Sequence, residues 1–413
     1  MAGLSEYAVL YKKDRRIRKD NMKERIITKN FVCAFGAQLS LALVMYTLMS
    51  TITEYVTAFG ATATIAGLVS GVYVVGGLFS RLYSGKAVEQ YGWKRLAVIF
   101  CVIHFAASCL YGLAGNVVML LIVRFIHGIG FGATMNTVML IGMAGLPKSR
   151  YGEAAGYFMM SASLGVAIGP FIGGWIYDNF GASGCFTAAS IFSLFVVVFV
   201  SMLDTKKIDP WYQKTEAEKA KKPTGKWSLN QLLEVKAIPL SLCIFCLCFG
   251  YASLMSFYRL YAQYTNLTDE FQYFFLIYAA MLLLSRPMAG KMQDKLGDNA
   301  VCYPCIIAQV VGIALLAWKP CMLTIVICAL CGALGYGTLN STLNVIVNRQ
   351  ISDERRSFAV STYWAFSDLG VGIAPAILGA IATATNYHIL YYVAAAISFV
   401  ALPIYWVAWG RKR

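Results

Sequence analysis

The stretch that decides the fold is Leu78-Phe79-Ser80-Arg81-x-x-x-Gly85-Lys86-x-x-Glu89-x-x-Gly92, because the chain carries it twice. The second copy begins 205 residues later and reads Leu283-Leu284-Ser285-Arg286-x-x-x-Gly290-Lys291-x-x-Asp294-x-x-Gly297. Both copies place their glycines and charged residues at the same spacing. Because glycine permits a tight turn, each copy predicts a sharp polar turn between two helices.

Two further segments repeat at the same offset. Gly130 and Gly132 align with Gly335 and Gly337. Leu164-Gly165-Val166-x-Ile168-x-Pro170 aligns with Leu369-Gly370-Val371-x-Ile373-x-Pro375. A constant offset across separate segments is hard to obtain by chance, so we interpret the chain as a tandem duplication of one unit.

The composition is that of a membrane protein. Of the 413 residues, 59% are hydrophobic and 13% are charged, and the mean hydropathy is +0.62. A soluble chain cannot bury so much apolar surface with so few charges outside. Apolar runs of about 20 residues recur, which is the length that a helix needs to cross the hydrocarbon layer. The predicted spans are 30–54, 63–84, 96–114, 117–145, 153–177, 184–203, 237–260, 270–289, 299–318, 321–346, 356–384 and 387–409.

The formal net charge of +15 raises the question of nucleic acid binding, but the placement of the charge argues against it. With a cytoplasmic N-terminus, thirty of the 35 lysines and arginines fall in cytoplasmic segments. This asymmetry is the positive-inside rule. We therefore expect a multi-pass protein of the inner (plasma) membrane that contacts anionic lipids, with both termini in the cytoplasm and no nucleic acid partner.

The duplication divides the chain into five segments. We expect a basic N-terminal segment 1–29, a six-helix bundle 30–203, a cytoplasmic linker 204–236, a second six-helix bundle 237–409 and a basic tail 410–413. Both copies begin in the cytoplasm and should be related by a pseudo-two-fold axis along the membrane normal. The predicted fold class is an all-α membrane protein of 12 transmembrane helices, with a substrate cavity between the bundles near mid-membrane.

The cysteines do not indicate a metal site. Cys243-x-x-Cys246-x-Cys248 and Cys302-x-x-Cys305 have metal-like spacing, but no His or carboxylate lies directly beside either set. We interpret them as packing residues and expect neither metal nor cofactor. A nucleophile–base set and a phosphate loop are also missing from the sequence, which argues against an enzyme.

The repeated residues and the six-plus-six plan resemble the major facilitator superfamily over essentially the whole chain after residue 29. The polar turns resemble the gating loop of that family. The family usually has Asp where Glu89 stands and a basic residue where Trp93 stands, whereas Asp294 keeps the usual residue. A plain polar turn is the alternative, and the second copy makes it insufficient. The resemblance implies gating roles for Gly85, Glu89, Gly92, Lys94, Arg95, Gly290, Asp294 and Gly297.

A second motif, Leu120-x-x-x-Arg124-x-x-His127-Gly128-x-Gly130-x-Gly132, resembles that of proton-coupled members, in which the Arg supports proton transfer. An Arg within a span is costly unless it faces water or an acid, so we favour a function for Arg124 over a snorkelling side chain. His127 stands where Gln is commoner, and a structural hydrogen-bonded His is an equal alternative.

A third motif, Gly165-Val-Ala-Ile-Gly169-Pro170-Phe-Ile-Gly173-Gly174, resembles the signature of the exporting antiporter branch. Glycines every four residues make a smooth stripe for close helix approach, and Pro170 bends the helix. Generic packing of small residues is the alternative. The full pattern is narrower than such packing requires, so it is our best indication of export.

Asp368 lies near the centre of the predicted span 356–384. Such a carboxyl group can load and release protons, so we expect Asp368 to carry the proton and Arg124 to couple it to transport. A structural Asp that pairs with a neighbour is the alternative. Glu54, at the outer end of the first span, is interpreted as an interface residue.

Polar and aromatic residues within spans are the candidates for a substrate cavity, although aromatic residues are also ordinary packing. These are Gln38, Tyr73, His127, Asn136, Tyr157, Tyr278, Tyr336, Asn340, Asn344, Tyr363 and Trp364. Such a cavity suits amphipathic or cationic cargo. We expect a monomeric, proton-driven exporter of small molecules, resembling the drug:proton antiporter branch. The alternatives are an uptake symporter for a sugar, organic acid or peptide, and a receptor or scaffold without transport.

Overall fold

The computed structural model describes residues 25–147, 150–214, 234–271, 273–351 and 355–412, which form helices and turns without a β-strand. The first half consists of α2 (Lys29–Ala58), α3 (Ala63–Tyr91), α4 (Trp93–Cys109), α5 (Val117–Ala144) and α6 (Tyr151–Met202). The second half consists of α8 (Ile238–Thr265), α9 (Thr268–Phe271), α10 (Phe274–Leu296), α11 (Asp298–Trp318), α12 (Met322–Gly332), η6 (Ala333–Thr338), α13 (Leu339–Gln350), α14 (Arg356–Ala384) and α15 (Tyr387–Ala408). The short turns are η1 (Leu110–Leu113), η3 (Pro210–Gln213), η5 (Val235–Ala237) and η7 (Gly410–Lys412).

Within the described chain, eleven segments are helices long and apolar enough to cross a membrane, compared with twelve predicted spans. The difference arises in α6, whose 52 residues contain both predicted spans 153–177 and 184–203. At about 1.5 Å per residue, α6 would be more than twice as long as the roughly 30 Å hydrocarbon layer is thick. Gly181 interrupts it with a φ of 66° and a ψ of −166°. These angles are not helical, so the regular helix is broken there. Glycine permits the break, because residues with a side chain rarely adopt this conformation.

The helix boundaries follow from local sequence. Several helices begin after a Thr or Asn whose side-chain oxygen accepts a hydrogen bond from a backbone N–H three residues on. These residues are Thr28, Thr62, Asn116 and Asn386. Gly92 and Gly297 end α3 and α10 with φ values of 81° and 87°. The last glycine of the repeated stretch therefore makes the same kind of turn twice.

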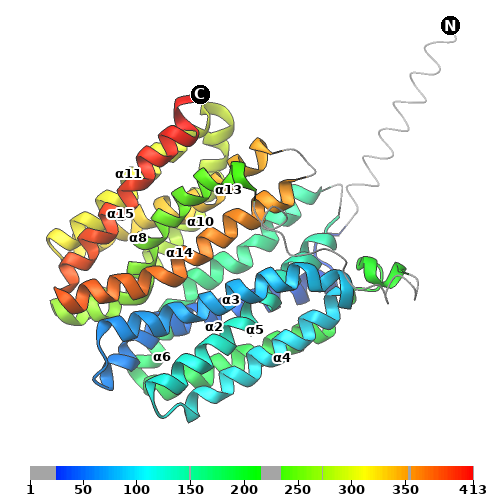
Figure 1. The fold of residues 1–413 in the computed structure, drawn as a ribbon, viewed down its shortest axis with the longest axis horizontal. Coiled ribbons are helices and arrows are strands. Elements are labelled where there is room, and N and C mark those ends of the chain that lie inside the picture. Colours follow the sequence, from blue (N-terminus) through cyan, green and yellow to red (C-terminus); the bar gives the residue numbers. More distant parts are fainter. Residues whose placement is uncertain (1–24, 148–149, 215–233, 272, 352–354, 413) are drawn as a thin grey trace, which may run out of the picture.

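Among the described residues, the most extensive contacts between the two halves are those of α3 with α14, α2 with α8, and α6 with α10. Figure 1 shows α3 running beside α14. Chain direction fixes the ends of this interface. Glu54, at the end of α2, and the first residues of α3 lie at one end, and Gly92 lies at the other. We call these the Glu54 end and the Gly92 end.

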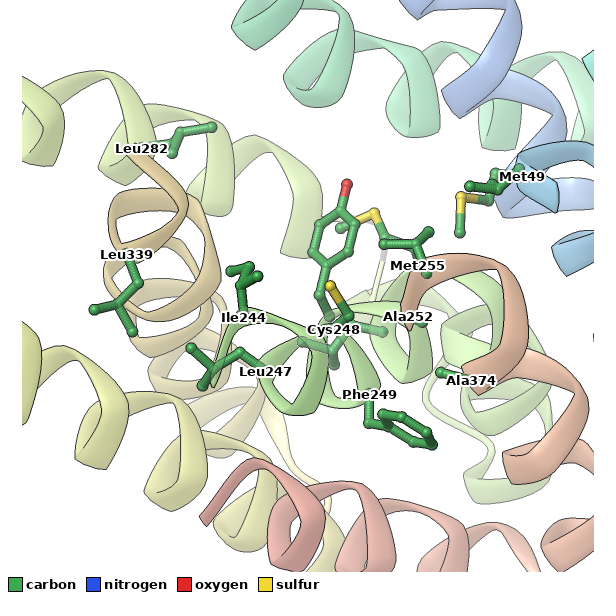
Figure 2. Close-up of a cluster of buried hydrophobic side chains, with 14 of the residues drawn as sticks. Met49, Ile244, Leu247, Cys248, Phe249, Ala252, Met255, Leu282, Leu339 and Ala374 are labelled. Carbon is green, nitrogen blue, oxygen red and sulfur yellow. The ribbon is translucent and has the colours of Figure 1, made fainter. Parts of the chain in front are cut away.

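Helix α8 forms the centre of the second half. Figure 2 shows Ile244, Leu247, Cys248 and Phe249 on α8, surrounded by buried side chains from neighbouring helices. Met49 of α2 belongs to the same buried cluster, so the core continues into the first half. Cys243, Cys246, Cys248, Cys302 and Cys305 are all buried as free thiols in this core. The described residues contain no group of three or more His, Cys, Asp or Glu side chains that could hold a metal ion.

Candidate functional site

A cavity of about 1710 Å³ lies between the two halves. Its wall includes residues in the middle of the helices, such as Arg81 and Asp368, and residues at the Gly92 end, such as Gln90 and Asn348. The cavity therefore extends from the middle of the bundle to the Gly92 end. Tyr251 and Tyr336 stack in its wall, with ring centroids 4.0 Å apart.

The backbone beside Tyr336 is unusual. Tyr336 lies in η6, a π-helical segment that is bent at Gly335, where ψ is −106°. A Cβ atom on Gly335 would lie 2.4 Å from the Cβ of Gln309, so this close approach needs glycine. Short π-helical segments are frequent at functional sites. Here the segment brings the Tyr336 ring to the cavity.

Asp368 forms an ion pair with Arg81, and the Oδ2 and Nη1 atoms are 2.8 Å apart. Arg81 belongs to α3 and Asp368 to α14, so the pair joins the two halves across the cavity. Both side chains are largely buried, and Asp368 Oδ2 lacks hydrogen-bond geometry to any described partner despite the short distance. We interpret the contact as an electrostatic one that can open without the loss of a well-aligned hydrogen bond.

The sequence repeat relates the Arg81–Asp368 ion pair to a second contact, between Arg286 and Ser163. Arg286 of α10 donates a hydrogen bond from Nη1 to the hydroxyl of Ser163 on α6. The offset of 205 residues relates Arg286 to Arg81 and Ser163 to Asp368. Both contacts join opposite halves, but the second has a serine where the first has a carboxylate.

Arg124 lies inside the first half, away from Asp368. Its side chain is 1% exposed, and it donates from Nε to the Val69 carbonyl (3.0 Å) and from Nη2 to the Ser70 carbonyl (3.2 Å). Its guanidinium lies over the Tyr73 ring, 4.6 Å from the centroid. Arg124 therefore fixes the backbone of α3, the helix that carries Arg81.

His127 lies beside Arg124 in the same buried region. Its Nδ1 is 2.8 Å from the Tyr111 hydroxyl, and its ring centroid is 4.2 Å from that of His104. Several atoms of this cluster have no hydrogen-bond partner among the described residues, namely Arg124 Nη1, His127 Nε2, both ring nitrogens of His104 and the Tyr73 hydroxyl. The cluster is thus polar and enclosed, and it does not line the cavity.

The Glu54 end is closed by polar contacts between the halves. Arg259 of α8 pairs with Glu54 of α2 and with Asp178 of α6. The Thr53 hydroxyl donates to the Ser256 carbonyl (2.6 Å). Glu54 lies at the end of α2, where the sequence placed it, but its pairing with Arg259 of the other half was not predicted.

Glycines bring the backbones of α3 and α14 together near the same end. A Cβ atom on Gly67 would lie 2.0 Å from the Pro375 carbonyl oxygen, and one on Gly71 would lie 1.9 Å from that of Gly372. Real Cβ atoms do not approach backbone this closely. The contact between these helices therefore requires glycine on α3.

The third sequence motif packs α6 against α2. A Cβ atom on Gly165 would lie 2.2 Å from that of Ala42, and one on Gly173 would lie 2.8 Å from the Thr47 carbonyl oxygen. Gly169 takes part in the same contact, and Pro170 lies within the helix. Gly174 instead lies next to Arg259: a Cβ atom on Gly174 would be 2.9 Å from Nη1 of Arg259. The motif therefore borders the closed end.

The repeated turns at the Gly92 end make different contacts. The backbone N–H of Trp93 donates to Asp209 Oδ2 (2.7 Å), so a residue of the linker caps α4. Lys94 Nζ donates to the Leu203 carbonyl (2.5 Å), whereas Arg95 is exposed.

The predicted gating glycines have open surroundings. A Cβ atom on Gly85 or Gly290 would have no heavy atom within 4 Å. Asp294 Oδ1 lies 3.2 Å from Arg349 Nη2 in the second copy. The side chain of Glu89 lies outside the described residues, as do residues 1–24 of the N-terminal segment and 215–233 of the linker.

The cavity contains part of the predicted residue set. Gln38, Asn136, Tyr278, Tyr336, Asn340 and Trp364 line it. Five predicted residues do not line it. Tyr73 and His127 belong to the Arg124 cluster, and Tyr157 is 50% exposed. Asn344 accepts a hydrogen bond from Asn348, and the Tyr363 hydroxyl donates to Asn340. Sequence reasoning also missed Arg81 and Arg286 as cavity residues, although both stand in the repeated stretch. It missed methionines of α5 at a four-residue spacing, which are Met135, Met139 and Met143.

The fold and this interface between two halves define a polytopic membrane transporter. A family model described as Major Facilitator Superfamily matches residues 34–352 and 240–413, so the chain belongs to that superfamily. It is accordingly a multi-pass membrane protein that binds small-molecule substrates, and it is not an enzyme.

Curated relatives support the same assignment. The chain is 25% identical to the multidrug resistance protein MdtG of Dickeya zeae, over 83% of this chain and 84% of that protein. It is 24% identical to the multi-drug resistance efflux pump PmrA of Streptococcus pneumoniae, over 79% of this chain and 82% of that protein. An uncharacterised MFS-type transporter of Methanocaldococcus jannaschii is also 24% identical, over 84% of this chain and 89% of that protein.

Solved structures share the fold at low sequence identity. The nucleoside transporter NupG matches with a TM-score of 0.70 and 13% identity, over 92% of this chain and 99% of that chain. A bacterial homolog of the human lysosomal transporter Spinster, in an inward-facing and occupied conformation, matches with a TM-score of 0.67 and 13% identity, over 93% of this chain and 96% of that chain. At this level of identity the likeness concerns the fold alone.

Proposed function

We propose that this transporter exports small molecules in exchange for protons by alternating access. The observation that carries the proposal is the Arg81–Asp368 ion pair, which joins the two halves within a cavity that reaches one end of the molecule. The attraction between two charged groups in such a position depends on the protonation of the acid and on the relative placement of the halves. The names of MdtG and PmrA, and the glycine motif of α6, favour export.

The proposed architecture is twelve spanning helices in two six-helix bundles, with Gly181 separating two spans within α6. The bundles would be related by a pseudo-two-fold axis along the membrane normal. The Arg81–Asp368 and Arg286–Ser163 contacts support this relation, because the sequence offset connects them residue by residue.

We assign the Gly92 end to the cytoplasm of a plasma-membrane protein, because the basic turns and linker lie there and cytoplasmic loops carry an excess of Lys and Arg. The cavity then faces inward, and both chain termini are cytoplasmic. Cysteine labelling of the linker 204–236 in intact cells tests this assignment, since a reagent that cannot cross the membrane should not reach it. External labelling of the linker would reverse the assignment.

In the proposed cycle, protonation removes the charge of Asp368 and releases Arg81. The interface between α3 and α14 then loses its electrostatic attraction at mid-height, so the halves can separate more easily at this level. Arg124 acts through α3, because it holds the Val69 and Ser70 carbonyls on the helix that carries Arg81. We propose this indirect coupling in place of a direct contact between Arg124 and Asp368.

The outward-facing state would require the opposite arrangement of the two ends. The Arg259 contacts at the Glu54 end would open, and the turns at the Gly92 end would approach each other. The open surroundings of Gly85 and Gly290 leave room for that approach. Gly92, Gly297, Glu89, Lys94, Arg95 and Asp294 would then form the gate that the family resemblance implies.

The direction of coupling is tested with everted membrane vesicles acidified inside by respiration. Each compound of a chemically diverse panel is added, and a fluorescent pH probe reports the internal pH. Exchange for protons predicts that a transported compound dissipates the pH gradient in parent vesicles but not in vesicles with Asp368→Asn. The alternative, an uptake symporter, predicts proton movement in the same direction as the compound.

A further inference from the structure

Arg286 carries a charge that no acidic side chain of the described residues balances. It donates a hydrogen bond to the Ser163 hydroxyl, and within the described chain it belongs to no ion pair. Its Nε is buried without a hydrogen-bond partner. An unpaired guanidinium in a low-dielectric site is costly, because it has lost water without gaining a counter-charge.

The cavity around Arg286 has an excess of positive charge. At mid-height its wall contains Arg81, Arg286 and Asp368. Asp368 is engaged by Arg81. Towards the Gly92 end, the carboxylate of Asp209 accepts hydrogen bonds from the backbone of Trp93 and Trp211. Neither carboxylate therefore compensates Arg286.

Aromatic and sulfur-containing side chains share the cavity with Arg286. Tyr251 and Tyr336 form a stacked pair, and Tyr278 lies in the same wall. Met45 and Met159 also line the cavity. Flat aromatic faces and adaptable thioethers suit a planar apolar body, whereas a guanidinium matches the two oxygens of a carboxylate.

We infer that the cargo is an organic anion with an aromatic body, whose carboxylate binds Arg286 beside Ser163. This inference rests on the proposed transport function and revises the sequence-based expectation of cationic cargo. Ser163 sets the preference, because a carboxylate at this position, like that of Asp368 in the other contact, would neutralise Arg286.

The test compares three ligands of similar shape and different charge. Full-length protein in lipid nanodiscs is titrated with 2-naphthoate, 2-naphthamide and 2-naphthylmethylammonium, and binding is followed by the rise in melting temperature. We expect stabilisation by naphthoate and little by the amide or the ammonium compound. No stabilisation by naphthoate, equal stabilisation by all three, or preference for the ammonium compound would overturn the inference.

Three variants locate the site. Arg286→Gln and Ser163→Asp should each bind naphthoate about tenfold to a hundredfold more weakly, the effect of losing a hydrogen bond between charged groups. Ser163→Ala separates the hydroxyl from the charge at the same position: it removes the hydroxyl but keeps the charge of Arg286, so naphthoate affinity should fall by less than about threefold. If the Ser163→Asp protein folds and binds naphthoate as tightly as the parent, the inference is also overturned. If this variant does not fold, the comparison of the three ligands on the parent protein decides the inference.

These experiments distinguish a failure of the proposed anion site from a failure of the proposed proton-coupled export. If naphthoate binds but does not dissipate the pH gradient of everted vesicles, the anion site stands and proton-coupled export is wrong. If the ammonium compound binds and dissipates the gradient in parent vesicles but not in Asp368→Asn vesicles, export stands and the anion site is wrong.

Discussion

Arg81 and Asp368 come from different halves of the molecule, and their charged atoms lie 2.8 Å apart in the wall of one cavity. The contact links three properties that a coupled transporter needs. In the proposed cycle it would respond to protonation; it also depends on the spacing of α3 and α14, and it lies in the wall of the cavity that would hold the cargo.

Asp368→Asn should separate folding from coupling. Asn has nearly the shape of Asp without its charge, so we expect normal membrane insertion and retained naphthoate binding, but no accumulation driven by a pH gradient. Uptake into everted vesicles measures this, with Asp269→Asn, an exposed acid of α9 outside the cavity, as the control. Parent-level accumulation by Asp368→Asn would move the proton site elsewhere, and Glu54 would be the next residue to examine.

Gly71→Ala should destabilise the closed Glu54 end. Its Cβ atom would lie 1.9 Å from the Gly372 carbonyl oxygen, so α3 and α14 must move apart. We expect a loss of about 1–3 kcal/mol, typical of overpacking, seen as a lower melting temperature. Gly85→Ala is the matched control on the same helix, because its surroundings are open. Equal melting temperatures for the two variants would argue against the tight helix contact.

Arg259→Gln should open the Glu54 end from outside. The native Cys185 reports on it, because this thiol is 1% exposed and lies near Gly173, whose carbonyl accepts its hydrogen bond. We expect faster modification of Cys185 in intact cells by a maleimide that cannot cross the membrane, followed by mass spectrometry. Lys319→Gln is the charge-matched control. An unchanged rate at Cys185 would mean that the Arg259 contacts do not hold this end closed.

The Glu234–Arg355 pair should make part of the stability depend on pH. Glu234 lies just before the span that begins at Val235, and its hydrogen bond with Arg355 lowers the pKa of the Glu234 carboxyl from its ordinary value of 4.5. A lowered folded-state pKa gives stability that is present above the unfolded pKa and lost as the pH falls through the folded one.

Because Arg355 is 45% exposed, we expect the ion pair to contribute about 1 kcal/mol or less to stability. Glu234→Gln should therefore lower the melting temperature slightly at pH 7, and the difference from the parent should shrink as the pH falls below 4.5 and vanish once the pH lies below the lowered pKa of Glu234. A difference that stays constant from pH 7 to pH 3.5 would contradict the role of this ion pair. The backbone bond from Glu234 to the Thr362 hydroxyl is unaffected by the substitution.

Local and repeated features were predictable from the sequence. Hydrophobic runs gave the positions of the spans. The last glycine of each repeat, Gly92 or Gly297, makes the predicted turn, whereas Gly85 and Gly290 lie inside α3 and α10 rather than in a turn. Gly181 shows the limit of this reasoning. Length and hydropathy separate the two spans around it, but they do not reveal that helical structure continues on both sides of a single broken residue.

Contacts between the halves were not predictable, because they join residues far apart in the chain. The sequence identified Asp368 as a central acid, but it could not identify Arg81 as its partner. It placed Arg124 in the coupling mechanism without revealing that its hydrogen bonds go to the backbone of α3. The unbalanced charge of Arg286 likewise becomes visible only when its neighbours are known.

The serine opposite Arg286 has an electrical consequence. With Asp368 ionised, Arg81, Arg286 and Asp368 leave the empty cavity with one net positive charge, and a bound monoanion cancels it. The loaded carrier would then move outward without carrying net charge. The empty carrier would return inward with a positive charge, and protonation of Asp368 would add a second. An inside-negative membrane voltage favours that return by up to about 2.3 kcal/mol per charge for each 100 mV. In such a transporter the membrane voltage would drive the return of the empty carrier rather than the outward movement of the loaded one.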